Sequence, residues 1–215
     1  MIDKRPRPEL EDIQDEIHNL SYVQLVLCGL VVCERLLPNY MIFCSHMNVG
    51  DARYLRLMLD CIWGEVGTAI DSSVTQERLR NTSELVPDSG DFPGPITGLA
   101  QFAVIALCHL LEAMMEDSVS NIAKVRMLAL DSVDAYIQVT SNTSQGLAGR
   151  EEFEAEWARI DSDPIMQAEI ERQAKEIERI SAFRIVDRDA VFRLKEEAES
   201  AHLFDVSALM PCPSM

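Results

Sequence analysis

Cysteine and histidine side chains gather in the segment 31–51, where they could bind a metal ion or supply a thiol nucleophile. Cys33, Cys44 and His46 lie within fourteen positions of one another. Side chains two positions apart on a helix point to nearly opposite sides, so Cys44 and His46 cannot bind one ion together. Structural zinc sites also use closely spaced ligand pairs, and the chain has no Cys-x-x-Cys sequence. We therefore interpret these residues as helix packing and predict no metal and no cofactor.

The adjacent charges Glu34 and Arg35 lie in an otherwise apolar part of the same segment. Such a pair most often lies partly exposed near the end of a helix, because charged side chains are seldom fully buried. Pro38 supports this placement, since a proline lacks the backbone donor and disfavours helical geometry in the residue before it. We therefore predict a helix that begins after the N-cap Ser21 and ends before Pro38, followed by a shorter helix over 39–46.

A second group of potential ligands shares the faces of two later helices. His109, Glu112 and Glu116 lie on one face, and Asp131 and Asp134 lie together on the next predicted helix. Di-iron bundles combine carboxylates and histidines in this way, but their sequence is Glu-x-x-His, repeated on two helices. Here the order is reversed and no second copy appears. We interpret this face as the exposed end of an otherwise buried helix.

Catalytic motifs give no support for an enzyme. The chain contains no Gly-x-Ser-x-Gly, no glycine-rich phosphate loop and no His-Glu-x-x-His, the arrangements that activate a serine, bind phosphates or hold a catalytic zinc. The polar side chains that could line a small-ligand pocket are Asn39, Tyr40, Asp51 and Asp60. We predict no catalytic residue.

The elements that would position these residues are all helices. Apolar residues recur at helical spacing, and strand-like alternation appears over no useful length. We predict an all-α fold: a single-domain helical bundle over 1–215, with flexible tails at 1–8 and 206–215. Its centre is a nearly fully buried helix over about 96–115, which follows a loop rich in proline and glycine at 87–95.

After a second predicted loop at 141–149, the chain becomes nearly half charged. Asp163 followed by Pro164 is typical of an N-cap with proline at the first helical position. The long charged helix that they begin carries a narrow apolar stripe, formed by Met166, Ile170, Ala174 and Ile177. Such a stripe buries little surface alone, so it must pack on the body of the protein or on a second copy. We predict a homodimer through this stripe.

Net charge limits the partners of the chain. With 36 acidic and 19 basic residues its formal net charge is −17, and its basic residues are interleaved with acids. Such a surface repels phosphate backbones and anionic lipids, so we predict no nucleic-acid partner and no membrane partner. The N-terminal segment lacks the apolar core of a signal peptide. We therefore expect a cytoplasmic protein in which five of the six cysteines are reduced core residues.

A block of sequence from Cys33 to Trp63 resembles a known bacterial family. The matching features are Cys33-Glu34-Arg35, Pro38-Asn39-Tyr40, Phe43-Cys44, Gly50-Asp51 and Leu59-Asp60 to Ile62-Trp63. The similarity continues through 87–92 and returns at Asp163-Pro164 and at 197–200. In these features the chain is similar, from about 20 to 209, to the YjaG-like proteins, the family of domain of unknown function 416. The resemblance implies an all-helical cytoplasmic protein without assigned biochemistry, and it transfers no functional residue.

Two hypotheses for the function stay open. The first is a non-enzymatic cytoplasmic helical protein that acts through self-association or a protein partner, and it needs no missing motif. The second is a small-ligand- or metal-binding helical protein or enzyme that uses polar groups near the 33–63 block. We favour the first from the sequence.

Overall fold

The structure, a computed structural model, describes residues 7–116, 118–141, 150–183, 188–205 and 209. Within these residues the chain forms nine helices and no strand. In chain order they are α1 (Leu10–Ile17), α2 (Tyr22–Met47), α3 (Ala52–Glu65), α4 (Ser72–Ser83), α5 (Pro95–Glu116), α6 (Val119–Thr140), α7 (Arg150–Asp161), α8 (Pro164–Ser181) and α9 (Arg188–Ser200). The prediction of an all-α fold is therefore confirmed.

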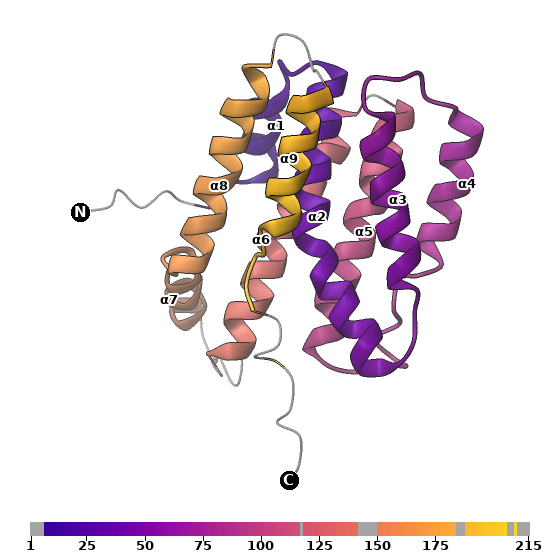
Figure 1. Ribbon diagram of the computed structural model, residues 1–215. Helices are drawn as coiled ribbons and strands as arrows, with labels where there is room; N and C mark the ends of the chain where they lie inside the picture. Colours follow the sequence, from indigo (N-terminus) through magenta and orange to yellow (C-terminus); the bar gives the residue numbers. More distant parts are fainter. Residues whose placement is uncertain (1–6, 117, 142–149, 184–187, 206–208, 210–215) are drawn as a thin grey trace.

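The helices α2 and α5 form the centre of the bundle (Figure 1). α5 contacts α2, α4 and α6, whereas α2 also contacts α3, α6, α8 and α9. α1 reaches the bundle through α6, and α7 contacts both α6 and α8. The predicted central helix over 96–115 is α5, and the loop predicted before it separates α4 from α5. Every described helix except α4 contributes buried residues to one hydrophobic cluster, and α4 packs the partly buried Leu79 against it.

Close packing at the centre requires a glycine on α2. A Cβ atom added to Gly29 would lie 2.8 Å from Cδ1 of Leu110 on α5 and 3.0 Å from Cδ1 of Ile122 on α6. Both distances are tighter than ordinary van der Waals contact, so a larger residue would require the ends of the Leu110 and Ile122 side chains to move. Gly29 therefore lets α2 approach α5 and α6 closely.

Two central helices, α2 and α5, are long and apolar enough to cross a membrane by length and composition. Of the most apolar window in each, 83% of α2 and 61% of α5 is buried inside the bundle. Helices in the core of a bundle meet the same criteria, so length and composition do not separate the two possibilities.

The predicted break at Pro38 is wrong, because α2 continues through this residue to Met47. A proline inside a helix costs about 3 kcal/mol, since it removes one backbone hydrogen bond and crowds the preceding turn. Packing on both sides offsets this cost: Leu36 and Leu37 before Pro38, and Tyr40 after it, are all buried. Tertiary packing around Pro38 therefore outweighs the tendency of proline to end a helix.

The predicted N-caps of two helices are confirmed. Ser21 and Gln24 form a capping box at α2, and Asp163 accepts from the N–H of Ile165 at α8. Two further aspartates cap helices: Asp51 accepts from the N–H of Tyr54 at α3, and Asp71 caps α4, which begins at Ser72.

The described part of the charged region after 149 forms three helices, α7, α8 and α9, and the helix predicted to begin after Asp163 is α8. Met166 and Ile170, the first members of the predicted stripe, are buried, and α8 contacts α2 and α6 of the same chain. Most of the predicted tails at 1–8 and 206–215, and all of the loop 141–149 except its first residue, lie outside the described residues. Arg7 is described, and its guanidinium binds Asp131 and Asp134 on α6.

The cysteines follow the prediction only in part. Cys28, Cys33 and Cys108 are buried, Cys44 is half-buried, and Cys212 lies outside the described residues. Burial raises the pKa of the Cys28 and Cys108 thiols to about 12, so both are protonated at neutral pH. Cys61 is exposed, because it lies on the outer face of α3.

Candidate functional site

The four polar residues predicted to line a pocket have different partners. The amide of Asn39 donates to the hydroxyl of Ser132 on α6 at 3.0 Å. The hydroxyl of Tyr40 accepts from the backbone N–H of Asp51 at 3.3 Å. The carboxylate of Asp60 binds basic side chains of α3 and α9 at 2.9 and 2.6 Å. The structure thus brings Tyr40 and Asp51 together, whereas Asn39 and Asp60 interact with other helices.

The face of α5 that carries His109 holds a local pair. Nδ1 of His109 lies 2.8 Å from a carboxylate oxygen of Glu112, and Glu116 is exposed. Asp131 and Asp134 bind Arg7 instead of extending this pair. Over the described residues, no three His, Cys, Asp or Glu side chains converge as metal ligands would.

The pair Glu34 and Arg35 is buried, which corrects the prediction that it is partly exposed at a helix end. The exposed fractions are 3% for Glu34 and 1% for Arg35. The reason is the continuity of α2, which places the pair in the middle of a central helix. Buried charges need partners, and Glu34 accepts from both Nη atoms of Arg56 at 2.5 and 2.7 Å and from the indole of Trp63 at 2.7 Å.

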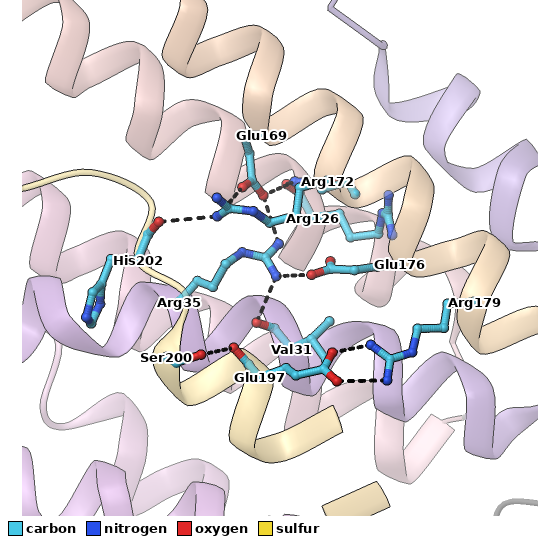
Figure 2. Close-up of polar contacts among 11 residues, drawn as sticks. Val31, Arg35, Arg126, Glu169, Arg172, Glu176, Arg179, Glu197, Ser200 and His202 are labelled. Carbon is cyan, nitrogen blue, oxygen red and sulfur yellow. Dashed lines mark hydrogen bonds and ion pairs between the residues drawn. The ribbon is translucent and has the colours of Figure 1, made fainter. Parts of the chain in front are cut away.

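Arg35 points away from this group and connects α2 to α8 (Figure 2). Its two Nη atoms lie 2.8 Å from Glu169 and 2.5 Å from Glu176, and one of them donates to the carbonyl of Val31 at 3.2 Å. Burial alone would lower the pKa of Arg35, but the two carboxylates raise it above the ordinary value. Arg35 is therefore a well-paired structural cation.

Arg126 of α6 is a second buried arginine beside this cluster, and it is poorly paired. Its exposed fraction is 1%, and neither Nε nor Nη1 has a hydrogen-bond partner among the described residues. Figure 2 draws no interaction to its guanidinium. Burial lowers the pKa of Arg126, and the charges near it, including Glu176, only partly offset this. An arginine keeps its proton even so, because its intrinsic pKa is far above neutral pH.

A pocket of about 470 Å³ lies against Arg126, between α1, α6 and α8. Its walls are apolar where Ile13, Leu130, Ile170 and Ala174 line it. Pockets that bind small molecules have volumes of about 300–1,000 Å³ and combine apolar walls with a few polar groups. The pocket therefore has the size and lining of a small-molecule site, with a buried cation beside it.

The charges around the pocket are arranged by depth. Asp12, Asp15 and Glu16 of α1 line it and are exposed. Two arginines line it, and Arg7 is engaged by two carboxylates of α6. Of the two arginines that line the pocket, Arg126 is therefore the one whose hydrogen-bond donors lack partners. Its side chain is buried, whereas the carboxylates of α1 are exposed at the rim.

Arg126 was missed from the sequence, although a signal was present. Its neighbours at helical spacing, Ile122, Ala129, Leu130 and Val133, are all buried. A single charge on an otherwise apolar helix face indicates a buried charge that has a specific role. The wall from α8 was predicted as a dimer stripe, and Ile170 and Ala174 of that stripe line the pocket.

The fold and the pocket define an all-helical protein with a buried ionic centre and a ligand-sized pocket beside it. The model of the family described as "Protein of unknown function (DUF416)" matches residues 12–205, so the chain belongs to this family. The resemblance seen in the sequence is therefore confirmed.

Relatives and one solved structure agree with this assignment. The chain is 27% identical over 186 residues to "Uncharacterized protein YjaG" of Escherichia coli strain K12, covering 82% of this chain and 89% of that protein. It is 28% identical over 153 residues to the protein of the same name from Salmonella typhimurium, covering 66% and 74%. The crystal structure of a DUF416 family protein from Shewanella baltica OS155 superposes with a TM-score of 0.72 at 23% identity, covering 86% of this chain and 92% of that one. These proteins carry no stated activity.

Proposed function

We propose that this protein is a non-enzymatic cytoplasmic protein that binds a small carboxylate in the pocket between α1, α6 and α8. The observation that carries the proposal is Arg126, a buried guanidinium with two unused donors beside a pocket of about 470 Å³. A ligand that brought an acceptor oxygen to one of these donors would supply the hydrogen-bond partner it lacks, once the atoms that cover the donor shift, because both donor atoms are closed to solvent.

The chemistry of the guanidinium favours a carboxylate as the ligand group. A buried donor without a partner costs about 1–3 kcal/mol, and more when it is charged. A carboxylate accepts a charge-assisted hydrogen bond from a guanidinium, which is stronger than a hydrogen bond between neutral groups. The unused Nε and Nη1 atoms of Arg126 lie on different edges of the planar group, so a ligand carboxylate would accept from one of them. Arg126 thus has a buried donor without a hydrogen-bond partner, and a ligand that accepts from it would remove the free-energy cost of that burial.

The thiol near Arg126 supports a binding role over a catalytic one. Cys28 lies close enough to Arg126 to interact with it, but burial raises the pKa of this thiol to about 12. The nucleophilic form of cysteine is the thiolate, which Cys28 does not populate at neutral pH.

The absence of nucleic-acid and membrane partners is part of the same proposal. It is supported by the net charge of −17, because such a chain repels polyanions. The burial of most of the apolar windows of α2 and α5 within the bundle favours the same conclusion.

Titration with hexanoate, followed by amide chemical shifts, tests the proposed binding. We expect saturable shifts at amides of α1, α6 and α8. Arg126→Met should weaken binding by at least about tenfold, because it removes a charge-assisted hydrogen bond. Arg126→Lys, which keeps the positive charge but removes the planar guanidinium, should weaken hexanoate binding as well. Arg53→Met removes an exposed cation of α3 outside the pocket and should leave binding unchanged.

Two results would count against the proposal. Equal hexanoate affinity in folded Arg126→Met and unmodified protein would show that Arg126 only balances the charge of Glu176. Shifts spread over α3 and α4, with none on the three pocket helices, would place carboxylate binding elsewhere.

A further inference from the structure

We propose that the ligand of this pocket carries a carboxylate at one end and a protonated amine at the other, separated by a short apolar chain. This inference rests on the proposed function, because it assigns the carboxylate end to Arg126. It adds the second charged group and the spacing between the two.

The rim of the pocket requires the second group to be a cation. Asp12, Asp15 and Glu16 line the pocket on the exposed side of α1. Asp12 already accepts from the backbone N–H of Glu9 at 2.9 Å, as part of the cap of α1. Asp15 and Glu16 have no such role in capping and line the pocket, so we assign the cation of the ligand to these two acids. A ligand with several negative charges, such as a phosphate ester, would meet repulsion at this rim.

Depth sets the distance between the two ends of the ligand. Arg126 is 1% exposed, whereas the rim carboxylates are exposed. The apolar residues Ile13, Leu130 and Ile170 line the same pocket. A ligand that reaches both charges must therefore cross an apolar wall, and a chain of methylene groups fits such a wall. Glu16 is the rim acid whose charge acts on Arg126, and the apolar lining between the two favours a ligand with separated charges over an α-amino acid, whose charges are adjacent.

Three probes with the same carbon chain separate these features. Hexanoate carries the carboxylate alone, 6-aminohexanoate adds the amine at the far end, and 2-aminohexanoate adds it next to the carboxylate. We expect 6-aminohexanoate to bind about fivefold more tightly than hexanoate, because an exposed ion pair contributes up to about 1 kcal/mol. We expect 2-aminohexanoate to bind more weakly than both. The preference for 6-aminohexanoate should disappear at high salt, since the rim is exposed to solvent.

Variants of α1 assign the preference to the rim. The double variant Asp15→Asn with Glu16→Gln should remove the preference for 6-aminohexanoate and leave hexanoate affinity nearly unchanged. Glu11→Gln removes one exposed acid of the same helix outside the pocket, so it should keep the preference. Because these positions are exposed, the variants should fold as the unmodified chain does.

The outcomes distinguish this inference from the proposed function. Equal affinity for hexanoate and 6-aminohexanoate would overturn the inference and leave the carboxylate site in place. Tightest binding of 2-aminohexanoate, or of inorganic phosphate, would also overturn it. If none of these probes binds, the proposed function itself is wrong. Retention of the amine preference in the double variant would show that the cation is recognised by residues other than Asp15 and Glu16.

Discussion

Arg35 and Arg126 have the same exposed fraction, 1%, and opposite surroundings. Glu169 and Glu176 raise the pKa of Arg35, so its folded environment favours the charged form. Burial lowers the pKa of Arg126, so its environment disfavours the charge. By linkage, the first charge contributes to folding stability and the second opposes it. The two residues therefore form a natural pair for comparison.

We expect Arg35→Met to lower the free energy of unfolding by about 3–5 kcal/mol, because it leaves the half-buried Glu176 without its cation and the buried Glu169 with Arg172 alone. Arg126→Met should raise it by roughly 1–2 kcal/mol in the absence of ligand, because it removes unsatisfied buried donors. Urea denaturation of both variants measures the two changes. A large loss of stability in Arg126→Met would show that its charge is needed by the buried acids.

The position and role of a residue could be predicted from the sequence when its partners lie nearby in the chain, and not when they come from another helix. Ser21 and Asp163 were recognised as N-caps because a cap interacts with residues two or three positions away. Glu34 was placed wrongly because its partners, Arg56 and Trp63, come from another helix. A rule for isolated charges cannot anticipate partners that only the tertiary fold supplies.

α9 is held to the bundle largely by ion pairs, which makes it the helix most sensitive to acid. Its buried residues are Leu194 and Ala198. Lys195 binds Asp60 of α3 at 2.6 Å, and Arg179 of α8 binds Glu197. With so little apolar area, the attachment of α9 depends on these carboxylates being ionised.

The sign of the pH effect follows from the pKa of these carboxylates. Burial by itself raises the pKa of Asp60, but the hydrogen bond from Lys195 and the charge of Arg56 bring it below the ordinary value. The hydrogen bond from Arg179 lowers the pKa of Glu197. Groups with a lowered pKa stabilise the fold above the ordinary carboxyl range, and this contribution is lost as pH falls through the lowered values. Glu176 of α8 behaves oppositely, because burial raises its pKa.

We therefore expect acid to release α9 before α8 and α5. Hydrogen exchange measured between about pH 6 and pH 3, corrected for the intrinsic rate, should show early loss of protection in α9. Lys195→Met should produce the same loss at neutral pH. Lys175→Met removes an exposed lysine of α8 that pairs within its own helix, and it should change nothing. Simultaneous loss of protection in all helices would contradict the expected order.

Helices were easier to predict than their boundaries. The start of α2 follows from its capping box, but its end does not follow from Pro38, because the packing of Tyr40 and its neighbours continues the helix. α7 and α9 were given no boundaries from the sequence, since neither begins with a recognised cap. The pocket could not be predicted, because its walls come from three helices that are distant in the chain.

For the whole molecule, the predicted homodimer stays a prediction. Met166 and Ile170 pack within the chain, so Ala174 and Ile177 are the partly exposed members of the stripe that a second copy could reach. Two chains of charge −17 repel each other, and added salt screens that repulsion. Light scattering at tens of micromolar should therefore report a dimer that tightens as ionic strength rises, and Ile177→Glu should weaken it. A monomer at all salt concentrations would leave the stripe as internal packing.

The walls of the pocket come from the beginning, the middle and the C-terminal part of the chain, through α1, α6 and α8. During synthesis the first two walls are made long before the third, so the site does not exist until α8 has been translated and has packed. A chain cut before Asp163 keeps Arg126 but loses the wall that carries Ile170 and Gln173. A small molecule bound there would then be held only by a finished chain, and by mass action it would protect finished chains selectively from unfolding and proteolysis.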